Sequence, residues 1–321
     1  MNNIEKNHDI HYIAKASFDD VQIMDRLERG ADAIEIQIGN PKTDPFMTGG
    51  GLDISLDLLP FIYSIHTPLW EGYDYPIDTD MGMYLLKKVS DRADVIVELT
   101  KQPLIIVCHL YLSVTDMKNA GLYKPLVKQM RKLADRHPGL TYVIENVTRR
   151  LADPFDNARL AEKIDRKNVG SCLDTCHAMM TIHNLHMLTV GAYNPTGAND
   201  YKEYTMEDAF RACKSSCMHL HLANAINTGD GIGYGNGHGV AFTKDTQAEL
   251  ENILDLYEQF GYDMPVVLEV KEDDYTKAEN FSSTLKMLND IMEARKYGRN
   301  QDEQTDNSWQ EKAAGLQVIT A

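Results

Sequence analysis

Short runs of apolar and β-branched residues, bounded by turn residues, recur along the whole chain. Eight such runs are present, and most are continuously hydrophobic. Continuous hydrophobicity is typical of strands that are buried on both faces of a parallel sheet. The predicted strands lie within Ile10–Ser17, Ala31–Ile38, Phe61–Thr67, Leu104–Leu110, Thr141–Val147, Val169–Asp174, Met218–Ala223 and Pro265–Val270.

Segments with the spacing of amphipathic helices separate these runs. Their apolar residues recur every three or four positions, which places them on one helix face. Thr79 and Thr243 are N-cap signals, and Gly261 is a signal for a helix C-terminus. The predicted helices cover Asp19–Arg29, Asp80–Gln102, Pro125–His137, Pro154–Ile164, Met206–Lys214, Lys244–Phe260 and Thr276–Tyr297.

The alternation of strands and helices predicts a (β/α)8 TIM barrel. A doubly wound open sheet is the alternative, but the count of eight strands and the polar residues at their ends favour the barrel. The length of 321 residues would allow two domains, yet barrels reach ~250 residues or more as one domain. We therefore predict a barrel over residues 1–299, with inserted loops, and a polar C-terminal extension over residues 300–321.

The net charge of the chain makes some classes of binding partner improbable. The chain has 32 Lys and Arg against 48 Asp and Glu, a net charge of −16, which disfavours general binding to nucleic acid or anionic lipid. The chain contains no run of 18 apolar residues, so we expect no membrane span. The first residues lack the apolar segment of a signal peptide, and the five cysteines suggest reduced thiols, so we expect a cytoplasmic protein.

Ionisable residues gather at the C-terminal ends of the predicted strands. In a TIM barrel these ends form the mouth where the active site lies. One histidine near an apolar strand is usually structural, but here several metal-binding side chain types converge. They are His66, His109, Glu145, Asp174 with His177 close behind, His219 and His221 on one strand, and Glu269.

The carboxylates in this set are flanked by apolar residues. Glu145, Asp174 and Glu269 would each be costly to bury without a partner. A divalent cation at the barrel mouth would neutralise all three, whereas a network of carboxylate–histidine ion pairs is the alternative. The mixed oxygen and nitrogen donors favour Mn²⁺ first, then Mg²⁺ or Co²⁺, and Zn²⁺ is compatible.

A glycine-rich stretch, Gly229–Gly239, follows the seventh predicted strand. A dinucleotide-binding fingerprint would instead follow the first strand and open a helix. We interpret the stretch as a long active-site loop with Asp230 and His238 as polar contributors; a surface loop without chemistry is the alternative.

Ordered motifs over residues 60–272 resemble the xylose-isomerase-like superfamily of TIM barrels. They are His66-Thr67-Pro68, Glu145-Asn146, Leu173-Asp174-Thr175-Cys176-His177, His221-Leu222-Ala223-Asn224 and Leu268-Glu269. This superfamily groups sugar isomerases and epimerases with the apurinic endonuclease family. The resemblance implies a metal-dependent enzyme that isomerises or epimerises a sugar or keto-sugar by abstracting a proton beside a metal-bound carbonyl.

The resemblance also implies roles for individual residues. By analogy with ketose 3-epimerases of the superfamily, Glu145, Asp174, His221 and Glu269 would hold one metal ion, with His219 as the fallback for His221. Glu145 and Glu269 would also act as acid and base. We expect His109 to take part in catalysis, and the substrate to contact the remaining histidines, which are His66, His177, His219 and His238.

Two other branches of the superfamily remain open. The α subunits of C-glycoside deglycosidases are lyases that work with a small β subunit, and the insertions Pro41–Leu59 and Gly191–Glu203 could serve such a partner. The apurinic endonucleases bind three zinc ions, but Asn236 stands here where that family has a metal-binding Asp. We expect a small carbohydrate substrate, and either a small second subunit or a homo-oligomer.

Overall fold

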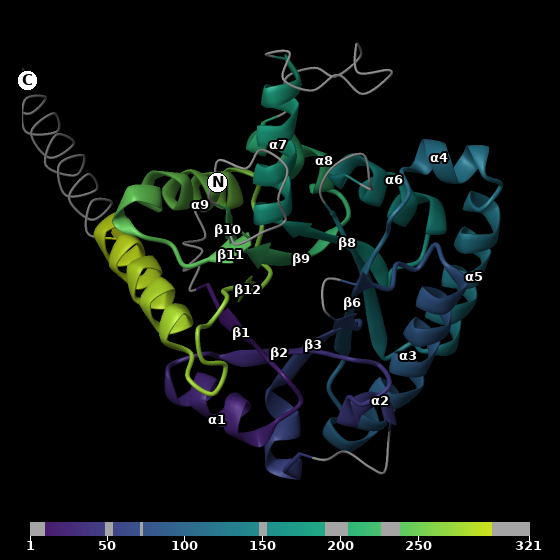
Figure 1. The fold of residues 1–321 in the computed structure, drawn as a ribbon, viewed down its shortest axis with the longest axis horizontal. Coiled ribbons are helices and arrows are strands. Elements are labelled where there is room, and N and C mark those ends of the chain that lie inside the picture. Colours follow the sequence, from purple (N-terminus) through teal and green to yellow (C-terminus); the bar gives the residue numbers. More distant parts are fainter. Residues whose placement is uncertain are drawn as a thin grey trace, which may run out of the picture.

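Eight parallel strands close into a barrel, and helices surround it (Figure 1). The computed structural model describes residues 10–48, 54–70, 73–147, 153–189, 205–225 and 238–296. The strand order around the barrel is β1-β12-β9-β8-β7-β6-β3-β2, which confirms the TIM barrel and excludes the open sheet. The strands are β1 (Tyr12–Ala16), β2 (Ala33–Gln37), β3 (Ile62–His66), β6 (Leu104–His109), β7 (Leu140–Glu145), β8 (Val169–Asp174), β9 (Cys217–Leu222) and β12 (Val266–Leu268).

The seven predicted helices are all present, and their ends follow local capping chemistry. Thr79 caps the long helix α3, because its hydroxyl accepts a hydrogen bond from the Gly82 amide at 3.0 Å. Gly261 has a φ of +69°, as expected just beyond a helix end. The helices are α1 (Asp20–Glu28), α3 (Asp80–Thr100), α5 (Tyr123–Arg136), α6 (Pro154–Ile164), α8 (Met206–Cys213), α9 (Gln247–Gln259) and a last one over residues 279–296.

The structure contains several helices that the sequence pattern did not predict. Between β2 and β3 the described residues form only the short helix α2 (Pro45–Thr48) and the 3-10 helix η1 (Leu56–Phe61). Directly after β8 comes α7 (Thr175–Thr189), which we did not predict because apolar and polar residues are mixed around its circumference. A second 3-10 helix, η3 (Lys244–Thr246), precedes α9, and α4 (Val114–Asn119) is too short for a periodic signal.

Small two-stranded sheets lie beside the barrel. One pairs β4 (Leu69–Trp70) with β5 (Tyr73–Asp74), and the other pairs β10 (Asn224–Ala225) with β11 (His238–Val240). Among the helices that the structure describes, none is long and apolar enough to cross a membrane.

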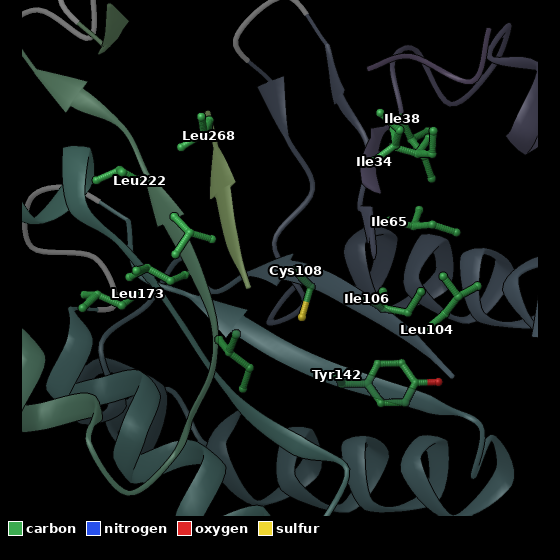
Figure 2. Packing of buried hydrophobic residues seen from close by; sticks show 14 of the residues in the cluster. Ile34, Ile38, Ile65, Leu104, Ile106, Cys108, Tyr142, Leu173, Leu222 and Leu268 are labelled. Atoms are coloured by element: carbon green, nitrogen blue, oxygen red, sulfur yellow. The ribbon is translucent and has the colours of Figure 1, made fainter. Parts of the chain in front are cut away.

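The side chains of each barrel strand alternate between the helix layer and the barrel interior. In β2 the buried residues Ile34 and Ile36 belong to the large hydrophobic core between sheet and helices, of which Figure 2 labels Ile34, Ile38 and Ile65 among others. A separate small cluster of Val107, Val143 and Cys172 joins β6, β7 and β8. The residue between the two isoleucines of β2 is Glu35, and its surroundings are polar.

Candidate metal centre

Four side chains meet at the C-terminal end of the barrel. Glu145 ends β7, Asp174 ends β8, His221 lies near the end of β9, and Glu269 directly follows β12. One ligand atom from each lies within 4.8 Å of the other three. Glu145, Asp174 and His221 are buried, whereas Glu269 is partly exposed. We call these four residues the rim cluster.

His221 lies at the centre of the rim cluster. Its Nδ1 atom lies 3.1 Å from Oε1 of Glu145, 2.9 Å from Oε2 of Glu269 and 3.8 Å from Oδ2 of Asp174. Burial alone would lower the pKa of His221, but nearby groups, Glu35 and Glu145 among them, raise it well above its usual value. The carboxylates around His221 therefore stabilise a positive charge at this point of the barrel mouth.

The donor set of the rim cluster fits a divalent cation. Three carboxylates and one imidazole offer the oxygen and nitrogen atoms that Mn²⁺, Mg²⁺, Co²⁺ and Zn²⁺ accept. Without a cation the three carboxylates would repel one another in a buried space. Burial would raise the pKa of Glu145, yet His221 and His109 lower it well below its usual value, so this carboxylate is ionised and able to bind metal.

The backbone around Asp174 is fixed by neighbouring motif residues. The Asn146 side chain accepts a hydrogen bond from the Asp174 amide at 2.8 Å and donates one to the Asp174 carbonyl at 3.0 Å. The His177 amide donates to Oδ1 of Asp174 at 2.6 Å. The Glu145-Asn146 and Asp174–His177 motifs therefore form one connected unit.

Two further predicted histidines flank Glu145. The Nε2 atoms of His66 and His109 each lie 2.9 Å from Oε2 of Glu145, and the three residues form a second group of potential ligands. His177 is more distant, with its Nε2 3.9 Å from Oε1 of Glu145. Burial lowers the pKa of His177 to about 4, so its imidazole is neutral near pH 7.

The remaining predicted residues lie outside the rim cluster. His219 faces Glu35, with its Nε2 2.8 Å from Oε2 of that carboxylate. The structure places only the backbone of His238, in β11. Asp230, most of Gly229–Gly239, and Gly191–Glu203 lie outside the described residues.

Sequence reasoning missed two charged residues beneath the rim. The ammonium group of Lys15, in β1, lies 3.0 Å from Oε2 of Glu269 and 3.3 Å from Oε1 of Glu35, in β2. Burial would lower the pKa of Lys15, but Glu269 and Glu35 raise it, so it carries a positive charge. The available signal was one charged residue within each of the first two strands, a lysine in β1 and a glutamate of opposite charge in β2.

Comparison with known proteins identifies the family of this chain. A family model described as xylose isomerase-like TIM barrel matches residues 86–291. The chain belongs to this family. The match confirms the resemblance that the ordered motifs indicated. No curated protein matches the sequence.

Several solved structures share the fold of this chain at low sequence identity. A D-tagatose 3-epimerase-like protein is 15% identical, with a TM-score of 0.54 over 89% of this chain and 98% of that chain. A xylose isomerase domain protein from Planctomyces limnophilus is 14% identical, with a TM-score of 0.56 over 88% and 96%. A D-allulose 3-epimerase from Methylomonas sp. is 16% identical, with a TM-score of 0.50 over 87% and 90%.

Proposed function

We propose that this protein is a divalent-metal-dependent isomerase or epimerase that acts on a small sugar or keto-sugar. The observation that carries the proposal is the rim cluster, in which ligand atoms of three carboxylates and one imidazole lie within 4.8 Å of one another at the barrel mouth. The 3-epimerases among the structural relatives support the sugar assignment. The polar, carboxylate-rich mouth also suits a substrate with several hydroxyl groups.

Glu145, Asp174, His221 and Glu269 would hold the cation, and Mn²⁺ is our first expectation. When bound, the cation supplies positive charge that stabilises negative charge developing on a substrate oxygen. Glu145 and Glu269 come from strands separated by β8 and β9 in the barrel, so they approach the mouth from different sides. One would remove the proton next to the carbonyl, and the other would return a proton.

Histidines around Glu145 would support this proton transfer. His109 contacts Oε2 of Glu145 at 2.9 Å, so it can hold a proton at that oxygen and act in catalysis. His177 is neutral near pH 7, so its imidazole can exchange hydrogen bonds with substrate hydroxyls. His66, which contacts the same oxygen of Glu145, stays a predicted substrate contact. We keep His219 and His238 as further predicted substrate contacts.

The decisive experiment is a screen of keto-sugars for solvent deuterium uptake at carbon next to the carbonyl. We expect uptake that requires added Mn²⁺, Mg²⁺ or Co²⁺ and that stops after chelation. Metal analysis of the purified protein should show about one divalent ion per chain, the number that four protein ligands typically hold. Metal-independent uptake, or no uptake with any keto-sugar, would contradict the proposal.

One observation favours a second candidate, a phosphodiesterase of the apurinic endonuclease type. His66, His109 and Oε2 of Glu145 form a second group of potential ligands next to the rim cluster, and the endonucleases bind several zinc ions. The net charge of −16 speaks against a DNA substrate. Three zinc ions per chain and cleavage of abasic DNA would favour this candidate. Co-purification of a small second subunit would instead favour the lyase branch.

A further inference from the structure

A layer of polar side chains lies directly beneath the rim cluster. Lys15, Glu35 and Ser64 are neighbours in register on β1, β2 and β3, and His219 of β9 reaches the same carboxylate from across the barrel. Glu35, Ser64 and His219 are fully buried, and the Lys15 side chain is only 12% exposed. We call these four residues the lower layer.

Glu35 is the centre of the lower layer. Its Oε2 accepts a hydrogen bond from the Ser64 hydroxyl at 2.7 Å and lies 2.8 Å from Nε2 of His219. The same Oε2 lies 3.2 Å from Nε2 of His221 in hydrogen-bonding geometry. Oε1 of Glu35 makes charge contacts with Nε2 of His221 at 3.1 Å and with the Lys15 ammonium at 3.3 Å. Three hydrogen-bond contacts on Oε2 and the charge contacts on Oε1 together fix this carboxylate in place.

The two nitrogens of the His221 ring therefore face different carboxylates. Nε2 points down to Glu35, whereas Nδ1 points up to the three carboxylates of the rim cluster. A histidine that binds metal through one nitrogen usually donates the other N–H to a carboxylate, which fixes the tautomer and the ring orientation. Glu35 occupies that second position for His221.

We infer that Glu35 is a positioning residue for the metal centre: it holds the proton of His221 on Nε2 and so directs the Nδ1 lone pair at the cation. Lys15 contacts both Glu35 and Glu269, so it connects the lower layer to a proposed ligand of the rim cluster. This inference rests on the proposed function only in that the rim cluster binds a divalent ion.

Metal affinity without substrate tests the inference directly. We would titrate apo-protein with Mn²⁺ by calorimetry in the wild type and in Glu35→Gln and Glu35→Leu variants. Loss of such an outer partner typically weakens metal binding about 10–100-fold. Glu35→Leu should lie at the upper end, because Glu35→Gln retains an oxygen that can accept from Nε2. Lys15→Met removes a positive charge beside Glu269, so it should not reproduce the loss of Mn²⁺ affinity expected in Glu35→Leu.

A matched control separates this role from general damage to the strand. Ile36→Val changes the next residue of β2, which is buried on the other face of the sheet. It should lower stability slightly and leave the Mn²⁺ affinity unchanged. Circular dichroism of each apo-variant shows whether the barrel has folded before affinities are compared.

A second readout reports the histidine tautomer itself. In Zn²⁺-loaded protein labelled with ¹⁵N-histidine, long-range NMR correlations should show His221 protonated at Nε2 and metal-bound at Nδ1. Metal bound at Nε2, or Mn²⁺ affinity within twofold of wild type in Glu35→Leu, would overturn the inference. Failure of the wild type to bind any divalent ion would overturn it too. Tight metal binding without sugar turnover would refute only the proposed reaction.

Discussion

The rim cluster and the lower layer are adjacent, yet their charges are balanced in opposite ways. The rim cluster sets three carboxylates against one imidazole. The lower layer surrounds a single carboxylate, Glu35, with an ammonium group, a hydroxyl and imidazole nitrogens. The charge of Glu35 is therefore balanced inside the protein by Lys15 and the histidines, whereas the three carboxylates of the rim cluster share that same ammonium group through Glu269 and have room for the positive charge of a cation. This difference is what we expect of a support and of the site that it supports.

The largest expected effect concerns turnover at the rim. Glu145→Gln or Glu269→Gln should lower kcat about 10²–10⁴-fold, the usual contribution of a general acid or base. Stopped assays of the keto-sugar identified in the deuterium screen would measure the loss, and circular dichroism would verify the fold. The exposed Asp245→Asn serves as a charge-matched control and should keep normal activity. Near-normal kcat in either glutamate variant would remove that residue from the acid–base pair.

The rim was largely predictable from sequence because its residues end apolar strands, where a TIM barrel places its site. Glu145 and Asp174 end their strands as predicted, and Glu269 follows its strand by one residue. The sequence left His219 and His221 as alternatives, because both face the barrel interior. What separates them is depth: His221 reaches the rim cluster and His219 reaches Glu35.

The lower layer was not predictable by the same rule. In the segment Ala33–Gln37, isoleucine alternates with Glu35 and Gln37, a pattern that usually marks a strand with one face in water. In a closed barrel the second face is the interior, so a polar position can be fully buried. Only the register of β1 with β2 pairs Lys15 with Glu35, and register is set by tertiary structure.

The next effect concerns the stability of the lower layer. Lys15→Met leaves Glu35 without its ammonium partner, and removing one member of a buried ion pair costs about 3–5 kcal/mol. Adding Glu35→Gln removes one of the two carboxylates that lose the ammonium group, so the double variant should recover part of the lost free energy of unfolding. Urea denaturation of metal-free wild type, both single variants and the double variant would measure this. Additive losses would show that the two side chains are not coupled.

Removal of the metal should lower the stability of the protein through the rim cluster, whereas the Lys15 and Glu35 variants lower it through the lower layer. A ligand that binds only the folded state stabilises it by about 2.7 kcal/mol at a concentration 100 times its Kd. We therefore expect chelation to lower the Tm of the wild type by about 5–10 °C, given the scaling for large domains. Differential scanning calorimetry with and without Mn²⁺ would measure the shift. In Asp174→Asn the shift should shrink, and an equal shift there would exclude Asp174 as a ligand.

The smallest effect is a pH dependence from His177, at the edge of the rim. Burial lowers its pKa to about 4 in the folded state, against about 6.5 in the unfolded chain. Above pH 6.5 both states are neutral and the full stability is present. As the pH falls from 6.5 towards 4, the unfolded state takes up the proton first, so stability is lost, by about 2 kcal/mol at pH 5. Denaturation of metal-free wild type and His177→Gln at pH 7 and pH 5 would test this. The variant should lose about 2 kcal/mol less than wild type between the two pH values, and an equal loss in both proteins would show that His177 is not the titrating group.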